Sequence, residues 1–222
     1  MQIANNILKH YLKNVYFITG TSYAGKSTTV QMLAERYGMK CCSENYHMAV
    51  SEIVATKESH PDICYNRQLS DWREFVMRAP EEYERWIYAV GREAAEFEIA
   101  ELIAISQNDR VIVDTNIPVE LLREIAEYDH VAVMLSPQSM SVDRFFDRRD
   151  PDKQFLLGVI DSCDDPEAVM ENYRAGLARI NSREHYEEYA NSGFFCVVRE
   201  DNGIDTREEV CDVIAKHFGF LR

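Results

Sequence analysis

The stretch VYFITGTSYAGKST, residues 15–28, decides the fold class of this chain. Its first five residues are apolar, aromatic or β-branched, which is typical of a strand that is buried on both faces. Gly20 ends this run. From Lys26 onward the apolar residues recur at helical spacing, and Gly38 is a suitable end for the helix. The sequence therefore predicts a strand, a glycine loop and a helix, in that order.

The loop from Gly20 to Ser27 fits the Walker A pattern G-x-x-x-x-G-K-[ST], in the strand-to-helix context that this pattern requires. Glycines let the backbone wrap around a phosphate, so that N–H groups and the positive end of the helix dipole point at its oxygens. We expect Lys26 to reach the β- and γ-phosphates of ATP and Ser27 to bind Mg²⁺. The alternative is a turn that only links strand to helix. The expected nucleotide-binding residues are Gly20, Thr21, Ser22, Ala24, Gly25, Lys26, Ser27 and Thr28.

The rest of the chain alternates short apolar runs with helical patterns. Further strands are predicted at 40–43, 111–113, 131–135 and 194–198. Helices are predicted before residue 15, throughout 65–106 with one break at Pro80, after Pro118, from 166 toward 191, and from a capping box at Thr206 through 217. We therefore expect an α/β fold of three layers, with a mostly parallel five-stranded sheet and helices on both faces.

Composition and length bound the class of protein. The 222 residues fit a single domain, residues 1–222. A formal charge of -14 repels phosphate backbones and acidic membrane surfaces, so neither a nucleic acid nor a membrane is an expected partner. The N-terminal residues lack the pattern of a secretory signal, and we expect a cytoplasmic protein. The six cysteines show no C-x-x-C spacing and are expected to be reduced.

The residues around Asp114 help to distinguish between the classes of Walker A protein. It follows the apolar run 111–113 and is followed by Thr115, Asn116 and Ile117. This is neither the D-x-x-G turn of a GTPase switch nor the acidic pair of a motor ATPase. The chain instead resembles the small P-loop kinases of the adenylate kinase and shikimate kinase superfamily, in which a similar strand ends in an aspartate that organises Mg²⁺. The resemblance implies that Asp114 and Ser27 are the metal-binding residues.

A second segment carries the same resemblance. The arginines of VDRFFDRR, residues 142–149, are spaced like those of the lid helix in adenylate kinases. The resemblance implies that Arg144 stacks on the base, that Arg148 and Arg149 face the transferring phosphoryl group, and that 143–165 is a lid. With Lys26 and Asp114, Arg148 and Arg149 form the expected catalytic set. The alternative is an exposed helix in which these arginines pair with Asp143 and Asp147.

The acceptor side is expected after the second strand, with 46–106 as a helical insertion. The candidate substrate-binding residues are Glu44, Asn45, His47 and Arg78. Glu44 could take a hydroxyl proton, although an ordinary helix cap is equally compatible with this segment. The arginines and tryptophans of the insertion would suit an anionic or aromatic acceptor, or else form the insertion's own core and surface. The D-G-x-P-R pattern of nucleoside monophosphate kinases is missing after Asp114, which argues against a monophosphate acceptor.

The leading hypothesis is an ATP-dependent, Mg²⁺-dependent phosphotransferase whose partners are the nucleotide and a small-molecule acceptor. One alternative is an ATP-binding regulatory module with little or no phosphoryl transfer. Transfer of a nucleotidyl or sulfuryl group is another. No metal site other than that of nucleotide-bound Mg²⁺ is expected from the histidine and cysteine spacings.

Overall fold

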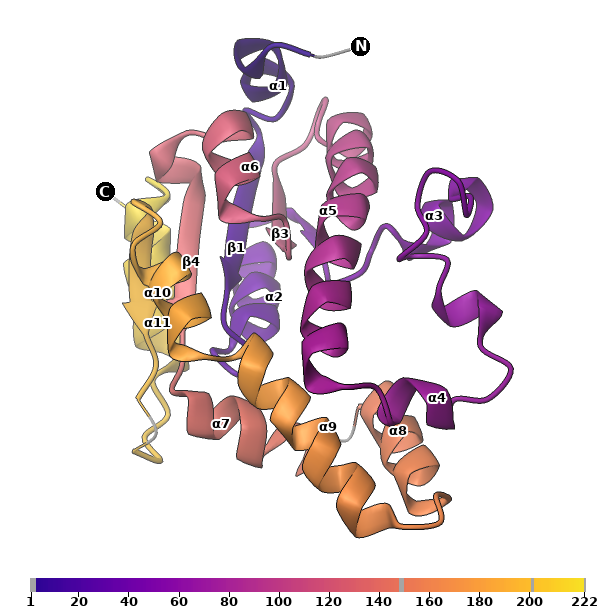
Figure 1. Ribbon diagram of the computed structural model, residues 1–222. Helices are drawn as coiled ribbons and strands as arrows, with labels where there is room; N and C mark the ends of the chain where they lie inside the picture. Colours follow the sequence, from indigo (N-terminus) through magenta and orange to yellow (C-terminus); the bar gives the residue numbers. More distant parts are fainter. Residues whose placement is uncertain (1–2, 148–149, 201, 222) are drawn as a thin grey trace.

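A computed structural model describes residues 3–147, 150–200 and 202–221. Within these residues five strands form one all-parallel sheet in the order β2-β3-β1-β4-β5, with helices on both sides of it (Figure 1). The strands are β1 (Val15–Gly20), β2 (Lys40–Cys42), β3 (Val111–Asp114), β4 (Val131–Leu135) and β5 (Phe195–Val198). The helices are α1 (Asn5–Tyr11), α2 (Lys26–Tyr37), α3 (Met48–Val54), α4 (Arg73–Val76), α5 (Pro80–Ile105), α6 (Val119–Ile125), α7 (Gln138–Asp143), α8 (Pro151–Asp161), α9 (Pro166–Ile180), α10 (Arg183–Ala190) and α11 (Arg207–His217), with 3₁₀ turns η1 (Asn66–Gln68), η2 (Tyr128–His130) and η3 (Phe145–Asp147).

Strand β1 lies at the centre of the sheet and supplies side chains to both faces. Val15 and Phe17 are buried in one core, which includes residues of α5 and α6. Ile18 is buried in the other core, which includes residues of α2 and α11. The alternation follows from the two-residue period of a strand, and it makes β1 apolar on both faces, as the sequence predicts.

The chain adds strands first on one side of β1 and then on the other. Strands β2 and β3 lie on one side of β1, and β4 and β5 lie on the other side. The crevice outside the carboxyl ends of strands at such a point is where parallel α/β sheets bind ligands. The glycine loop leaves the carboxyl end of β1, and Asp114 is the last residue of β3.

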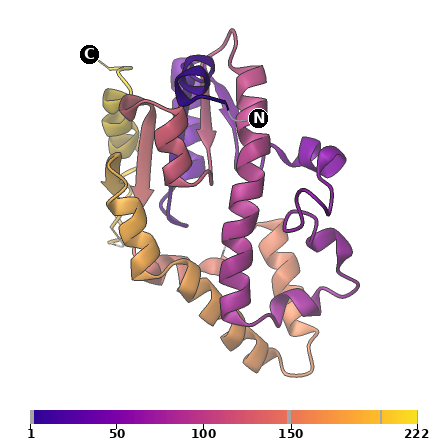
Figure 2. The same ribbon diagram turned by 45° about the horizontal axis from the view of Figure 1, so that its top comes forward.

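A third core lies among the helices beyond these carboxyl ends. Figures 1 and 2 show α4, α8, α9 and the first half of α5 packed together there. The buried residues of this helical cluster are Phe75, Val76, Tyr83, Ile160, Cys163, Tyr173 and Leu177. Helix α5 also supplies Ala95 and Leu102 to the core against the sheet. One helix therefore joins the helical cluster to the sheet.

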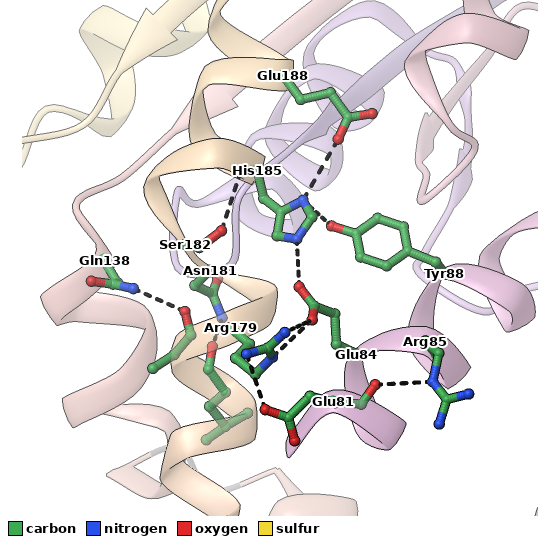
Figure 3. Close-up of polar contacts among 12 residues, drawn as sticks. Glu81, Glu84, Arg85, Tyr88, Gln138, Arg179, Asn181, Ser182, His185 and Glu188 are labelled. Carbon is green, nitrogen blue, oxygen red and sulfur yellow. Dashed lines mark hydrogen bonds and ion pairs between the residues drawn. The ribbon is translucent and has the colours of Figure 1, made fainter. Parts of the chain in front are cut away.

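A polar network ties α5 to α9 and α10 (Figure 3). The Glu84 carboxylate accepts a hydrogen bond from Arg179 at 2.8 Å and lies 3.0 Å from Nε2 of His185. Tyr88 and Glu188 contact the other nitrogen of the same imidazole ring. The hydrogen bond with His185 is the main cause that lowers the pKa of Glu84 from its usual value. The network therefore favours the ionised form of Glu84.

The helical predictions need correction in several places. Residues 65–72 contain a 3₁₀ turn and no α-helix, and α4 spans four residues, so the segment before Pro80 is not continuously helical. The helix predicted from 166 toward 191 is two helices, because Ser182 caps a new helix through its side chain. Helix α8 was not predicted as a separate helix, whereas α3 lies within 46–106, which was predicted to be a helical insertion. Thr206 occupies the N-cap of α11 but makes no side-chain cap hydrogen bond.

The predicted α/β class, with five strands and helices on both faces, is confirmed, and the sheet is wholly parallel. Among the helices in the described part of the chain, none has the length and apolar content needed to cross a bilayer.

Gly20→Ala should lower stability strongly. Gly20 has a φ of +125°, and a Cβ at this position would lie 2.0 Å from the carbonyl oxygen of Met134 in β4. Strain and the clash together should cost about 2–4 kcal/mol, seen in thermal denaturation as a fall in Tm of roughly 5–15 °C. Gly158→Ala in α8 is the control, because a Cβ there meets nothing within 4 Å and should slightly raise Tm. Equal Tm values for the two variants would contradict this view of the β1–β4 junction.

Glu84→Gln should reduce stability at neutral pH but not in acid. Because the pKa of Glu84 is lowered in the folded state, its contribution is present above the ordinary glutamate value of 4.5 and is lost as pH falls below it. The Glu84 side chain is 21% exposed and its partner Arg179 is 42% exposed, so solvent screens the pair and the difference at pH 7 should stay below about 1 kcal/mol. Urea denaturation of both proteins at pH 7 and pH 3.5 measures it. If the difference in unfolding free energy between wild type and variant is larger at pH 3.5 than at pH 7, Glu84 does not stabilise the fold through its ionised form.

Candidate functional site

The glycine loop has a backbone shape that few residue types adopt. Gly20 and Gly25 have φ values of +125° and +95°, and Tyr23, between them, has a φ of +66°. Helix α2 starts at Lys26 with Gly25 as its N-cap. The backbone N–H groups of Gly25, Lys26 and Ser27 donate no hydrogen bond to any residue in the described ranges. Donors left unpaired at a helix N-terminus, together with the helix dipole, favour an anion at this position.

The loop is held from the neighbouring strands β4 and β5. Thr21 donates its backbone N–H to Met134, and its hydroxyl contacts both the hydroxyl and the backbone N–H of Ser136. The hydroxyls of Ser136 and Ser141 both donate to the carbonyl oxygen of Ser22. Polar residues that follow β4 therefore fix the first half of the loop.

Arg199 holds the loop from its other side. It follows the last residue of β5, and its guanidinium donates to the carbonyl oxygen of Tyr23 at 2.8 Å. The sequence places a polar segment here, but nothing in that segment indicates a contact with the glycine loop. The contact joins residues 176 positions apart, so a local pattern carries no signal for it.

Lys26, Ser27 and Asp114 meet at the loop. Nζ of Lys26 donates to the carbonyl oxygens of Gly20 and Thr21 at 3.3 and 3.2 Å. The hydroxyl of Ser27 donates to Oδ2 of Asp114 at 2.6 Å. The carboxylate of Asp114 is almost wholly buried. A hydroxyl and a carboxylate oxygen side by side are a donor set that suits Mg²⁺.

The remaining loop residues differ in exposure. Ala24 is buried in the core that α2 forms with the sheet, whereas Ser22 and Thr28 are exposed. Thr28 lies in the first turn of α2. All the residues predicted to bind the nucleotide from 20 to 28 therefore lie in one loop and the first turn of one helix.

The acceptor-side candidates fall into two groups. Glu44 is exposed and accepts a hydrogen bond from the side chain of Asn116 at 2.9 Å, which places it beside the end of β3. Asn45 is exposed, with a left-handed φ of +64°. His47 is buried, at the start of α3, and its Nδ1 atom has no hydrogen-bond partner in the part of the chain that the structure describes.

Arg78 lies apart from these residues, in the helical cluster. Its guanidinium carbon lies 3.9 Å from the ring centroid of Tyr65 and 4.8 Å from that of Trp86. The ring of Phe75 is a third neighbour, at 5.2 Å. The structure therefore surrounds Arg78 with aromatic rings and shows no contact between it and Glu44, His47 or the glycine loop.

The segment with the three arginines is not the helix that was predicted. Helix α7 ends at Asp143, Arg144 is its exposed C-cap, and a short 3₁₀ turn follows. Arg148 and Arg149 lie outside the described residues. Helix α8 then begins with Asp150 as its N-cap.

Glu98 is a buried acid beside the site that the sequence reasoning missed. It lies on α5 with an exposed fraction of 3%, and it accepts a hydrogen bond from the hydroxyl of Thr115 at 2.6 Å. Thr115 directly follows Asp114 and also accepts the backbone N–H of Ile117. Burial is the main cause that raises the pKa of Glu98 to about 7; the Thr115 hydrogen bond opposes the shift. A charge among Ala94, Phe97 and Leu102 on the apolar stripe of α5 was the available signal.

In the described ranges, no group of three or more histidine, cysteine, aspartate or glutamate side chains has the arrangement of a metal site. The six cysteines are all free, and Cys41 is the exposed one.

Glu98→Gln should remove a pH dependence of stability. The pKa of Glu98 is raised from 4.5 to about 7 on folding, so the stability that its protonated form allows is present below 4.5 and is lost as pH rises through about 7. The loss should approach about 3 kcal/mol. Glutamine keeps an oxygen for Thr115 but cannot ionise.

Chemical denaturation of wild type and variant from pH 5 to pH 8.5 checks this expectation. Glu124→Gln, a change at an exposed position of α6, is the control and should follow the wild-type curve. If the unfolding free energies of Glu98→Gln and wild type change with pH in the same way, Glu98 has the same pKa in the folded and the unfolded chain.

Comparisons with known proteins identify no family for this chain. No protein-family model matches the sequence, and no curated protein matches it. The glycine loop, its unpaired amides and the Ser27–Asp114 pair are therefore the basis on which a function is inferred.

Proposed function

We propose that this protein is an ATP-dependent phosphotransferase that acts on a small-molecule acceptor. The observation that carries the proposal is the set of unpaired backbone N–H groups at Gly25, Lys26 and Ser27, next to the Lys26 ammonium and the Ser27–Asp114 pair. These groups suit a chain of phosphates with a bound divalent cation. The residues present therefore fit both ATP and Mg²⁺.

The resemblance to the small P-loop kinases supports the same proposal. In that superfamily an apolar strand later in the chain than the phosphate loop ends in an aspartate that organises Mg²⁺. Here the glycine loop follows the central strand β1, and Asp114 ends its neighbour β3. The hydrogen bond between Ser27 and Asp114 joins residues 87 positions apart, and a chance match to the Walker A pattern would not require it.

Each residue has a proposed role in the transfer. Lys26 stabilises the negative charge that develops on the phosphoryl oxygens, and the loop amides hold the phosphates in place. Bound Mg²⁺, held by Ser27 and Asp114, supplies further charge neutralisation. The acceptor's hydroxyl oxygen forms a bond to the γ-phosphorus, the bond from that phosphorus to the oxygen of ADP breaks, and the hydroxyl proton passes to a carboxylate. Glu44 is exposed beside Asn116 and is the candidate for that carboxylate.

The lid and insertion roles are part of the proposal. We assign acceptor binding to the insertion, 46–106, and closure over the nucleotide to the segment 143–165, in which Arg144, Arg148 and Arg149 lie. Both segments contribute to the helical cluster, through α4 and α8. Closure would exclude water from the transfer.

Lys26→Ala should weaken the binding of MgATP by about tenfold or more, because the variant loses the cation nearest the phosphates. Isothermal titration calorimetry with MgATP measures this. Lys13→Ala is the matched control: it removes one exposed lysine from the turn before β1 and should bind as wild type does.

Wild-type affinity in Lys26→Ala would refute the assignment of the loop. Full MgATP binding by the wild type without any phosphorylated product, across a broad set of hydroxylated metabolites, would instead favour an ATP-binding regulatory module.

A further inference from the structure

Three carboxyl groups lie near one another at the carboxyl ends of β2 and β3, and one of them comes from α5. Asp114 ends β3, and Thr115 links it to Glu98 on α5. Asn116, next in the chain, donates to Glu44. This group, which we call the acidic end, comprises Glu44, Glu98 and Asp114. It adjoins the glycine loop through the Ser27–Asp114 hydrogen bond.

The acidic end has a negative field. Burial is the largest cause that raises the pKa of Glu98, and the charges of Asp114 and Glu44 raise it further, so these groups act on one another. In the described part of the chain, no lysine or arginine forms an ion pair with Glu44 or Glu98. A phosphate or carboxylate placed beside Glu44 and Glu98 would be repelled when these two groups are ionised.

Four arginines of the insertion contact groups other than the acidic end. Arg73 donates to Asp71 at 2.8 Å, and Arg92 lies 3.5 Å from Glu120 on α6. Arg67 donates to the carbonyl oxygens at the end of α3. Arg78 is covered by aromatic rings. The composition of the insertion suggested an anionic acceptor. None of these four arginines is placed to bind such an acceptor near Asp114.

His47 gives an independent indication of a ligand. Its side chain has an exposed fraction of 7%, and its buried Nδ1 atom lies 3.9 Å from Oε1 of Glu98 and has no hydrogen-bond partner within residues 3–147, 150–200 and 202–221. That separation is too long for a direct hydrogen bond, but one hydroxyl oxygen can lie within hydrogen-bond distance of both atoms. An unpaired buried polar atom is costly, and a bound hydroxyl group would satisfy it.

We propose that the acceptor is a hydroxylated small molecule without negative charge, such as a polyol, a nucleoside or an amino alcohol, bound at the acidic end by Glu44, His47 and Asn116. This inference rests on the phosphotransferase function proposed above. Carboxylates accept hydrogen bonds from hydroxyl and ammonium groups, whereas they repel anions.

Matched pairs of acceptors test the inference. The full chain is incubated with Mg²⁺ and ATP and, in turn, with a nucleoside and its 3′-monophosphate, which keeps the 5′-hydroxyl, a hexose and its aldonic acid, and an amino alcohol and the corresponding hydroxy acid. ADP release gives the rate, and mass spectrometry identifies the phosphorylated product. In every pair that reacts, the member without negative charge should have a kcat/KM about tenfold or more above that of its anionic partner.

Two variants test the role of charge. Asn116→Lys places a cation beside Glu44 at an exposed position and should lower that preference about tenfold. Glu52→Gln on α3 removes an exposed carboxylate outside the acidic end and should leave the preference unchanged.

The possible results distinguish a failure of the acceptor inference from a failure of the phosphotransferase function. A higher kcat/KM for the anionic members would overturn the inference and leave the phosphotransferase function standing. An unaltered preference in Asn116→Lys would also overturn it. Absence of any product, in a protein that binds MgATP, would overturn the function itself and the inference with it.

Discussion

The close approach of Gly20 to β4 is the constraint on which the site depends. Gly20 pairs in register with Met134, and there is no room between them for a side chain. The backbone can therefore turn out of the sheet only at a glycine, directly after the last ladder position. Thr21 then donates to the same Met134 carbonyl, so the loop begins in a fixed direction. The position of Lys26 follows from that direction.

A chain of side-chain contacts extends from this loop to the helical part of the molecule. Ser27 donates to Asp114, Thr115 donates to Glu98, and Glu98 lies on α5 opposite His47. Most of these groups are buried, and their contacts run from α2, past the end of β3, to α5 on the opposite face of the sheet. Buried polar groups that are paired in this way restrict the geometry of a site more than exposed ones do. Nδ1 of His47, which has no hydrogen-bond partner among the described residues, lies 3.9 Å from Oε1 of Glu98 in the acidic end.

The strands, the glycine loop and Asp114 could be predicted because each has a local signature: a β-branched run, a spaced motif, or an acid at a strand end. The bounds of α3 could not, because this seven-residue helix has no side-chain cap and helices of this size are held by tertiary packing rather than by their own propensity. The start of α8 did have a local signal, Asp150 as N-cap followed by Pro151, but it was not used. The break between α9 and α10 had a signal in the capping residue Ser182, which was outweighed by the continuous helical pattern around it. Ser136, Glu98 and Arg199 act through partners 17 to 176 residues away, and nothing in their neighbours reveals those partners.

Helix α5 makes the two ends of the molecule mechanically dependent on each other. It is 26 residues long without a break, which corresponds to about 39 Å. Glu84 anchors its first half to α9 and α10, and Glu98, about 21 Å further along, contacts the residue after Asp114. An unbroken helix of this length moves as one rigid element. Any tilt of the helical cluster against the sheet either moves Glu98 relative to Thr115 or bends the helix, so a movement that begins among α4, α8 and α9 is transmitted to the carboxyl end of β3.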